Sequence, residues 1–365
     1  MLIKLGGAEK VVESLMEIFP NADLYTLIYD EKKVWSVFPK EKIHSVAKPT
    51  QRLYTILKNQ RFCLPLMPRA VESLDFSEYD YVISSSSWFA HGPIVSWKTK
   101  LITYYHSPAR YLWDWTHEYR SDIWWDTWIK WFLLWKLFKH LRIWDIESSK
   151  RSHISLANSH NTQNRVEKYF RKDSEILYPP VETERFAKKL TIQNHQDQEK
   201  YYIILSALTE FKKIEVAIEG FNKTPEIQLK IIWDGNHRSH LENLKTWENI
   251  EFVWAQYWDD LVSLVQHSQG LIFPWEEDFG IVPIEVMAAG KPVFAYRWWW
   301  LLETVIEWET GEFFDNKDGK DFVEKLRVFD ANNKKWWYKK SACKKQAEKF
   351  SQEVFAKKIQ TYISS

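Results

Sequence analysis

Two glutamates in the last third of the chain have the types and spacing that suit a hydroxyl-rich ligand. Glu277 and Glu285 are separated by seven residues in the segment PWEEDFGIVPIEVMAAGKPV, residues 274–293. Pro283 indicates that an apolar helix begins close to it, because proline lacks the N–H group that would be unpaired in a first turn. The free N–H groups and positive dipole end of that helix suit a phosphate. Two carboxylates beside a phosphate site predict a ligand rich in hydroxyls and phosphate, such as a nucleotide sugar.

Further polar side chains follow apolar runs that read as strands. His106 is in TKLITYYHSP, residues 99–108, and Ser84–Ser87 follow the run that begins at Tyr79. Lys212 comes soon after YYIILSAL, residues 201–208. Ligands of open α/β sheets lie beyond the carboxyl ends of the strands. We therefore expect these side chains at ligand-facing positions.

Each of these residues has a structural alternative. A glutamate pair at this spacing can be a solvated face, and Lys212 beside Lys213 can be ordinary surface charge. A histidine at a strand end is more often a packed or capping residue than a catalytic one. The Phe279–Gly280 pair, the proline and the apolar helix favour binding for the glutamates, and the sequence HSPARYLWD favours it for His106.

The elements that must position these residues alternate between strand and helix. From Tyr201 onward, five short continuous apolar runs alternate with amphipathic stretches: YYIILSAL, LKIIWDG, IEFVW, GLIFP and PVFAY. Buried parallel strands read as continuous apolar runs, and this succession is typical of a doubly wound parallel sheet. The predicted fold class of the second half is therefore α/β and Rossmann-like.

The first half has the same kind of pattern in a less regular form. A helix is predicted at residues 8–18, strands at 22–29, 79–86, 99–108 and 154–157, and a further helix at 162–170. Pro179 and Pro180 interrupt the pattern, and a polar connector follows at 193–200. We expect an N-terminal domain at residues 1–178, a C-terminal domain at 179–350, and a terminal helix at 351–365 that packs back on the N-terminal domain.

Composition excludes several classes of protein. A chain of 365 residues exceeds the roughly 100–200 residues of one domain. Hydrophobic residues at 45% and charged residues at 27% are typical of a globular protein, and no run of about 18 apolar residues could span a bilayer. The formal net charge of +1 gives no global field toward nucleic acid. Cys63 and Cys343 lack metal-type spacing, and the first residues do not resemble a signal peptide, so a cytoplasmic location is expected.

Four motifs in order resemble the family 4 glycosyltransferases, which are retaining enzymes of the GT-B fold. They are GGAEKVVESL near the start, YYHSPARYLWD, LANSHNTQNRVEKYF before YPPVETERF, and the segment with the two glutamates. The resemblance covers most of the chain. It implies two Rossmann-like doubly wound domains that face a cleft. Within the family, the chain most resembles the mannosyltransferase-like members that build bacterial surface polysaccharides.

The resemblance also implies a role for individual residues. Glu285 would hold the ribose of the nucleotide, and Glu277 the hydroxyls of the donor sugar. Lys212 would neutralise the diphosphate, and His106 would lie beside the donor sugar. Backbone at Phe279, Gly280, Ile281 and Val282 would support sugar and phosphate, and Gly6 and Gly7 would let backbone approach the phosphates or the acceptor.

The implied function is transfer of a hexose from a nucleotide-diphosphate sugar to a glycan or lipid-linked acceptor. GDP-mannose is the candidate donor. Because Lys212 and a helix end can stabilise the departing phosphates and no Asp-x-Asp motif is present, no metal and no cofactor are expected. Front-face attack with retention needs no dedicated nucleophile. The alternative function is that of a non-catalytic nucleotide-sugar-binding or scaffold protein with a degenerate site.

The sequence departs from the family pattern at two places. Only Met1–Leu5 precede the glycine pair, where the family usually has a first strand, so the start is a candidate for truncation. Ala207 stands where the family commonly has an arginine, and Lys213 is the candidate replacement. Residues 123–144 mix aromatic and basic side chains, which suits either peripheral membrane contact or a packed helix.

Tryptophan is over-represented and glycine is scarce. The chain has 22 Trp and 10 Gly, although glycine normally makes up about 7% of residues. We hypothesise that the gene reads the codon UGA as glycine, so that many of these positions are glycine; UGG codons at 298–300 would contradict this. Trp113 and Trp144 fit their context as tryptophan. The positions where the fold asks for glycine instead are Trp233, Trp254, Trp275, Trp298, Trp299, Trp300 and Trp308.

Overall fold

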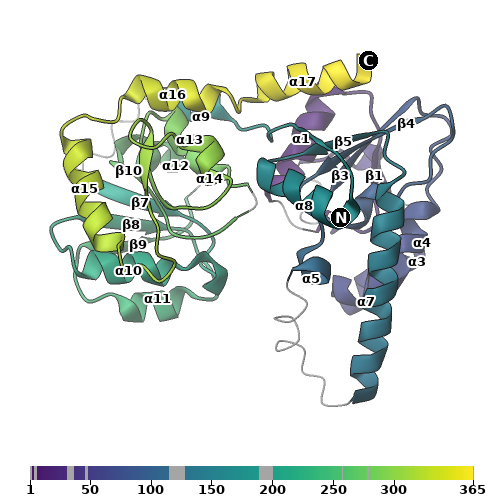
Figure 1. Ribbon diagram of the computed structural model, residues 1–365, viewed down its shortest axis with the longest axis horizontal. Coiled ribbons are helices and arrows are strands. Elements are labelled where there is room, and N and C mark those ends of the chain that lie inside the picture. The colour runs from purple at the N-terminus through teal and green to yellow at the C-terminus, as the bar shows by residue number, and fades with distance from the viewer. Residues whose placement is uncertain are drawn as a thin grey trace. The chain divides into compact units, whose positions relative to one another are not determined.

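The structure is a computed structural model, and it divides the chain into two compact units. It describes residues 2–3, 6–30, 37–45, 48–114, 128–188, 200–256, 258–277 and 279–364. Unit 1 comprises Met1–Pro179 with Phe355–Ser365, and unit 2 comprises Pro180–Val354 (Figure 1). The division falls one residue after the predicted boundary at 178. The predicted connector lies outside the described residues apart from Lys200.

Unit 2 is built on a six-stranded sheet in which every recorded strand pair is parallel. Its order is β12-β11-β10-β7-β8-β9. β7, the first strand of unit 2 in chain order, pairs with both β8 and β10, so the strand order reverses between β7 and β10, as in a doubly wound fold. The predicted runs form five strands, and β12 is an addition. The strands are β7 (Tyr201–Leu205), β8 (Gln228–Ile232), β9 (Ile250–Val253), β10 (Gly270–Phe273), β11 (Val293–Tyr296) and β12 (Gly311–Phe314).

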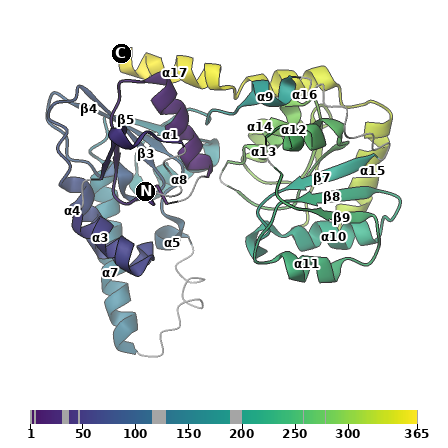
Figure 2. The same cartoon turned by 180° about the vertical axis from the view of Figure 1, so that it is seen from behind.

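The helices of unit 2 bury the faces of this sheet. All five residues of β7 and all four of β10 are buried, which explains why both strands are continuous apolar runs. Figures 1 and 2 both show α12, α13 and α14 above β7, and α10 and α11 below β9. The helices are α9 (Thr183–Ala187), η4 (Glu210–Lys212), α10 (Ile214–Asn222), α11 (Arg238–Leu244), α12 (Trp258–His267), α13 (Val282–Ala288), α14 (Leu301–Thr304), α15 (Phe322–Lys334) and α16 (Lys340–Glu348).

Unit 1 contains a four-stranded parallel sheet in the order β3-β4-β5-β6. β1 and β2 form a separate parallel pair, so the predicted first-half strands do not all join one sheet. Leu2 forms an isolated parallel bridge with Tyr29 and is buried, so a short extended contact precedes the first helix. The strands are β1 (Leu24–Thr26), β2 (Ile43–Ser45), β3 (Tyr81–Ser86), β4 (Lys100–Tyr105), β5 (Ile154–Ala157) and β6 (Glu175–Ile176).

The helices of unit 1 include the C-terminal helix of the chain. Phe355 and Ile359 of that helix are buried in one cluster with Val11, Leu15 and Ile102, so its apolar face completes the core of unit 1. The helices are α1 (Gly7–Ile18), η1 (Lys40–Lys42), α3 (Lys48–Leu57), η2 (Gln60–Leu66), α4 (Met67–Glu72), η3 (Phe89–His91), α5 (Arg110–Trp113), α7 (Trp128–Ser149), α8 (His160–Phe170) and α17 (Gln352–Ser364).

The aromatic and basic segment at 123–144 lies largely in α7, and residues 123–127 lie outside the described residues. Phe138 and Leu141 are buried in the core of unit 1, which supports the packed-helix interpretation for that part of α7. Phe132 and Trp135 are exposed nearer its start. Among the helices that the structure describes, none combines the length and the apolar character needed to cross a membrane.

Three tryptophans adopt backbone conformations that favour glycine. The φ angles of Trp233, Trp308 and Trp336 are +133°, +68° and +58°. Side chains with a Cβ rarely occupy this region because Cβ approaches the carbonyl oxygen. The expectation of glycine-type positions agrees with these angles at Trp233 and Trp308. The other five tryptophans to which it applied have no positive φ: Trp254, Trp275, Trp298, Trp299 and Trp300. The codon hypothesis itself stays a prediction, because the angles describe what the backbone requires and not how the gene is read.

Trp336 closes α15 in the way that glycine usually does. Its N–H donates to the carbonyl of Asn333 (3.0 Å), and the N–H of Trp337 donates to the carbonyl of Asn332 (3.1 Å). These two bonds and the left-handed residue make a Schellman motif, in which glycine is the usual occupant. The Trp336 side chain is 87% exposed, so packing returns little of the backbone cost.

We predict that Trp336→Gly raises the free energy of unfolding by about 1 kcal/mol, because glycine removes the left-handed Cβ penalty. Denaturant unfolding of the two proteins side by side measures the difference. The control is Trp97→Gly, since Trp97 is 89% exposed and has no positive φ. Equal effects of the two substitutions would contradict the backbone argument.

Candidate functional site

The reversal of strand order between β7 and β10 positions two of the predicted site residues. Lys212 ends η4, which follows β7, and Glu277 lies on the loop that follows β10. β7 and β10 are hydrogen-bonded neighbours, with Tyr202 opposite Gly270. Connections leave such neighbouring strands toward opposite faces, and ligands of doubly wound sheets bind outside the carboxyl ends at this point. Lys212 and Glu277 therefore meet at the switch point of this sheet.

An ion pair joins these two residues. Lys212 Nζ lies 3.2 Å from Glu277 Oε1, and the side chains are 22% and 38% exposed. Trp275 contacts both partners: its ring centroid lies 4.9 Å from Lys212 Nζ, and its Nε1 donates to Glu277 Oε2 at 3.3 Å. A partly exposed ion pair stabilises by about 0–1 kcal/mol and a cation–π contact by roughly as much. Contacts of this strength orient both charged groups and can still be exchanged for those of a ligand.

The tryptophans of this region pack into the interior more than the sequence suggested. Trp275 is buried, and its ring centroid lies 3.9 Å from that of Phe273. Trp300 is also buried, whereas Trp299 is 63% exposed. Trp300 is one of the positions where the sequence pattern asked for glycine, but the start of α14 turns its side chain inward against Phe273 and Phe279.

The side chains around position 280 leave room for glycine and not for a larger residue. A Cβ at this position would lie 2.7 Å from the Trp300 ring and 3.1 Å from Glu277 Oε2. The Phe279 ring lies 5.6 Å from that of Trp300. The Phe279–Gly280 pair is thus part of the packing that holds the loop of Glu277 in place.

The predicted helix after this loop is present as α13. Pro283 lies in its first turn, and Ile281 precedes it as the N-cap residue. The Glu285 N–H donates to the Ile281 carbonyl at 3.0 Å, and the Glu285 side chain is 8% exposed. Val282 begins the helix. Burial of this carboxylate in a first turn, where the helix dipole favours negative charge, fits a residue that holds a defined partner.

His106 and Ser85 meet at the carboxyl ends of β3 and β4. The parallel register places Ser85 opposite Tyr104, and Ser85 Oγ lies 2.8 Å from His106 Nε2. The His106 ring also contacts the Tyr104 ring edge-on at 5.1 Å, and Thr162 donates to the His106 carbonyl at 3.1 Å. The sequence therefore indicated the right edge of the sheet, but not that Ser85 is the partner of the imidazole.

Gly6 and Gly7 begin the first helix of unit 1. Gly6 is the N-cap of α1, and its N–H donates to Glu9 Oε2 at 3.0 Å. A Cβ at Gly7 would meet no heavy atom within 4 Å. Internal packing therefore does not demand glycine at Gly7, and close approach of a ligand remains its predicted role.

The predicted site residues are divided between the two units. Lys212, Glu277 and Gly280 are in contact with one another or with shared neighbours in unit 2. Unit 2 also contains Phe279, Ile281, Val282 and Glu285, and unit 1 contains Gly6, Gly7 and His106. That the residues of unit 1 and those of unit 2 form one site stays a prediction.

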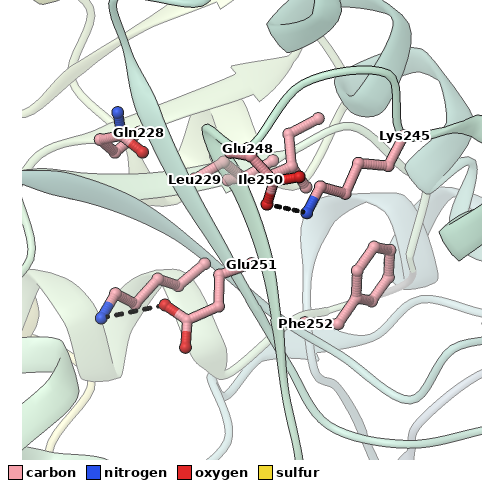
Figure 3. Close-up of a pocket in the computed structure, with 8 residues that line it drawn as sticks. Gln228, Leu229, Lys245, Glu248, Ile250, Glu251 and Phe252 are labelled. Atoms are coloured by element: carbon pink, nitrogen blue, oxygen red, sulfur yellow. Dashed lines mark hydrogen bonds and ion pairs between the residues drawn. The ribbon is translucent and has the colours of Figure 1, made fainter.

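A separate pocket of about 270 Å³ lies along β8 and β9 (Figure 3). It carries the ion pairs Lys245–Glu248 (3.1 Å) and Lys230–Glu251 (3.2 Å). Its strand residues come from the first positions of both strands, including Gln228. Because ligands of doubly wound sheets bind beyond the carboxyl ends, this pocket is not the candidate donor site.

Comparisons with known families cover nearly the whole chain. Residues 185–350 match the family described as "Glycosyl transferases group 1", and residues 5–185 match "Glycosyltransferase Family 4". A sulfoquinovosyl transferase of Arabidopsis thaliana is 25% identical over 191 residues, which are 51% of this chain and 37% of that protein. An alpha-1,3/1,6-mannosyltransferase of Dictyostelium discoideum is 24% identical over 241 residues, covering 54% of this chain and 56% of that protein. The matched regions thus span about half of each curated relative or less.

Solved structures share the fold over the full chain. HepE of Anabaena, solved in complex with UDP, has a TM-score of 0.71 and 13% identity, covering 100% of this chain and 98% of that one. A sucrose-phosphate synthase of Thermosynechococcus elongatus has a TM-score of 0.73 and 15% identity, covering 100% and 96%. At this identity the likeness establishes the GT-B fold and leaves specificity to the site residues.

We predict that Gly280→Ala lowers the free energy of unfolding by about 1–3 kcal/mol, because the new methyl group overlaps the buried Trp300 ring. Denaturant unfolding measures the change. Gly7→Ala is the matched control: its Cβ has open space in a helical first turn, so stability should stay unchanged or rise. Equal loss in both variants would show that Gly280 is not held by the Trp300 contact.

Proposed function

The chain belongs to the family 4 glycosyltransferases, and from this membership we propose that it moves a hexose from a nucleoside-diphosphate sugar to a glycan or lipid-linked acceptor. The observation that carries the proposal is the Lys212–Glu277 pair beyond β7 and β10, where the strand order reverses. A cation and a carboxylate at that edge suit a ligand with both phosphate and sugar hydroxyls. The two family matches favour transfer over the alternative of a non-catalytic binding or scaffold protein.

Lys212 is proposed to stabilise the leaving group. Cleavage of the bond between the sugar and the nucleoside diphosphate increases negative charge on the phosphate oxygens. A cation fixed near those oxygens lowers the barrier because the added charge appears in the transition state. The Trp275 ring and Glu277 already hold the Lys212 ammonium in position, so little ordering is needed when the phosphates arrive. This account needs no metal ion, which is part of the proposal.

The carboxylates are proposed to orient the donor. Glu277 would accept hydrogen bonds from sugar hydroxyls, while the Lys212 ammonium, close to its present position, contacts the phosphates. Glu285 would hold the ribose from the first turn of α13. The backbone of Phe279, Gly280, Ile281 and Val282 would line the sugar and phosphates.

Unit 1 is proposed to supply residues that contact the donor sugar and the acceptor. His106, held by Ser85, would lie beside the donor sugar, and Gly6 and Gly7 would let backbone approach the phosphates or acceptor. Attack of an acceptor hydroxyl on the same face as the departing phosphate gives retention, and that phosphate can take the acceptor proton. Such a reaction requires no enzyme nucleophile.

GDP-mannose is the proposed donor. Curated relatives include GDP-Man-dependent alpha-1,2-mannosyltransferases by name, such as that of Candida glabrata. UDP and UDP-glucose occur in the HepE structures, so uridine donors are the competing class. A cytoplasmic location with peripheral membrane contact through the exposed Phe132 and Trp135 of α7 completes the proposal.

We predict that GDP-mannose raises the melting temperature of the chain more than UDP-glucose does at equal concentration. A ligand that binds only the folded state stabilises by about 2.7 kcal/mol at 100 times its Kd. A thermal-shift panel of nucleotide sugars measures this. A larger shift with UDP-glucose would reassign the donor, and no shift with any member would contradict nucleotide-sugar binding.

We predict that Glu277→Ala lowers nucleoside diphosphate release by about 100-fold or more, because the sugar loses its orienting carboxylate. The assay is release of nucleoside diphosphate from the donor with acceptor present. Turnover at the wild-type rate in this variant would show that Glu277 is not part of the site. Donor binding by the wild-type protein with no turnover on any acceptor would favour the non-catalytic alternative.

We predict that Lys212→Ala weakens nucleoside diphosphate binding by about tenfold or more, because one charge-assisted contact to phosphate is lost. Lys223→Ala is the matched control: it removes an exposed lysine of the same unit, at the C-cap of α10, to which no role in the site is assigned. Isothermal titration with GDP and UDP measures both variants. Equal weakening would indicate a general charge effect in place of a specific contact.

A further inference from the structure

A cluster of two imidazoles and one carboxylate lies outside the candidate donor site. One ligating atom from each of Glu215, His237 and His240 lies within 4.8 Å of the others. His237 Nε2 is 2.6 Å from Glu215 Oε1, and the two imidazole centroids are 4.6 Å apart. We propose that these three residues bind a divalent transition-metal ion, for which Zn²⁺ is the best match to the donor set.

The fold explains why the three side chains converge. Glu215 is in the first turn of α10, His237 is the N-cap of α11, and His240 is three residues further on the same face. α10 and α11 pack against each other. Three protein ligands of this kind leave one position of a tetrahedral zinc open for water.

The second carboxylate oxygen of Glu215 points to a missing partner. Glu215 Oε2 is buried and has no hydrogen-bond partner among the described residues. A buried carboxylate oxygen without a partner is costly, and a cation removes that cost. A plain histidine–carboxylate hydrogen bond accounts for Oε1 only, whereas a bound ion accounts for Oε2 as well.

Arg238, which is adjacent to His237 in the sequence, does not compete for this position. The Arg238 guanidinium donates to the carbonyls of Trp233 and Phe252, both at 3.3 Å, and lies 4.0 Å from the Trp254 ring centroid. Its Nε donates to Glu242 at 2.7 Å. These contacts use the positive charge elsewhere and leave the carboxylate of Glu215 to the imidazoles and the ion.

The ion would brace the segments that follow β7 and β8. The His237 N–H donates to the Leu208 carbonyl (3.1 Å), and the Leu208 N–H donates to the Asp234 carbonyl (3.1 Å). A Cβ at Gly235 would lie 2.2 Å from the same Leu208 oxygen, so the two segments touch at backbone level. Glu215 follows Lys212 by three residues. Metal binding would therefore stiffen the loop that carries Lys212 without contacting the donor.

The test is zinc binding by the full chain after chelator treatment. Competition with a chromophoric chelator should give one Zn²⁺ per chain, and zinc should raise the melting temperature. Co²⁺ bound in the same site should give the visible absorption of a four-coordinate ion. None of these readouts depends on sugar transfer, so their failure is distinguishable from failure of the proposed function.

His240→Gln is the decisive variant, because His240 is exposed and its recorded contact is with the His237 ring. We expect it to weaken zinc binding by about tenfold or more and to abolish the Co²⁺ absorption. The matched control is His160→Gln, which makes the same change at an exposed histidine of α8 and should leave both unchanged. Absence of zinc binding by the wild-type chain, or equal binding by His240→Gln, would overturn the proposal.

Discussion

The reversal of strand order beside β7 is the constraint on which the candidate site depends. β7 is the first strand of unit 2 in chain order, and it pairs with β8 on one side and β10 on the other. The chain must therefore leave these neighbouring strands in opposite directions, and this is where ligands of doubly wound sheets bind. Lys212 lies in the segment that follows β7, and Glu277 lies in the loop that follows β10. Their pairing is therefore a consequence of the sheet topology.

Packing around the Lys212–Glu277 pair decides how well it is oriented. Trp275 contacts both charged groups and is itself buried against Phe273, so the pair is tied to the end of a core strand. The cost is crowding, because Trp300 leaves no room for a side chain at position 280. If some of these tryptophans are glycine in the cell, the loop has more space than this sequence allows and the lysine loses its aromatic neighbour.

The sequence predicted the elements that carry strong periodicity. The strand at Ile154–Ala157 and the helix beginning near Gly7 are where the apolar pattern placed them, since the strand buries three consecutive residues and the helix buries one face at Val11, Ser14 and Leu15. β2, β6 and β12 were missed: β2 and β6 are three and two residues long, and GEFF in β12 carries a charged Glu312 that is buried with Tyr338 and Asn332 as partners. Such partners come from distant chain segments, which a local pattern does not contain.

The site was predictable in type and not in detail. Residue chemistry and motif order indicated Lys212, Glu277 and Glu285, but the ring beneath the lysine and the serine beside His106 depend on strand register. The proposed metal-binding cluster could not be predicted from the sequence for the same reason, because strand β8 lies between Glu215 and His237 in the chain. Glycine-type backbone at Trp233 and Trp308, in contrast, was foreseen because those positions follow strands or turns where the chain must bend sharply.

A crystal structure of the full chain with an intact nucleoside-diphosphate sugar tests the central claim most directly. The account predicts Lys212 Nζ at about 3 Å from a phosphate oxygen, with Glu277 on a sugar hydroxyl and Glu285 on the ribose. A diphosphate bound away from the carboxyl ends of β7 and β10, with Lys212 and Glu277 still paired only with each other, would contradict it.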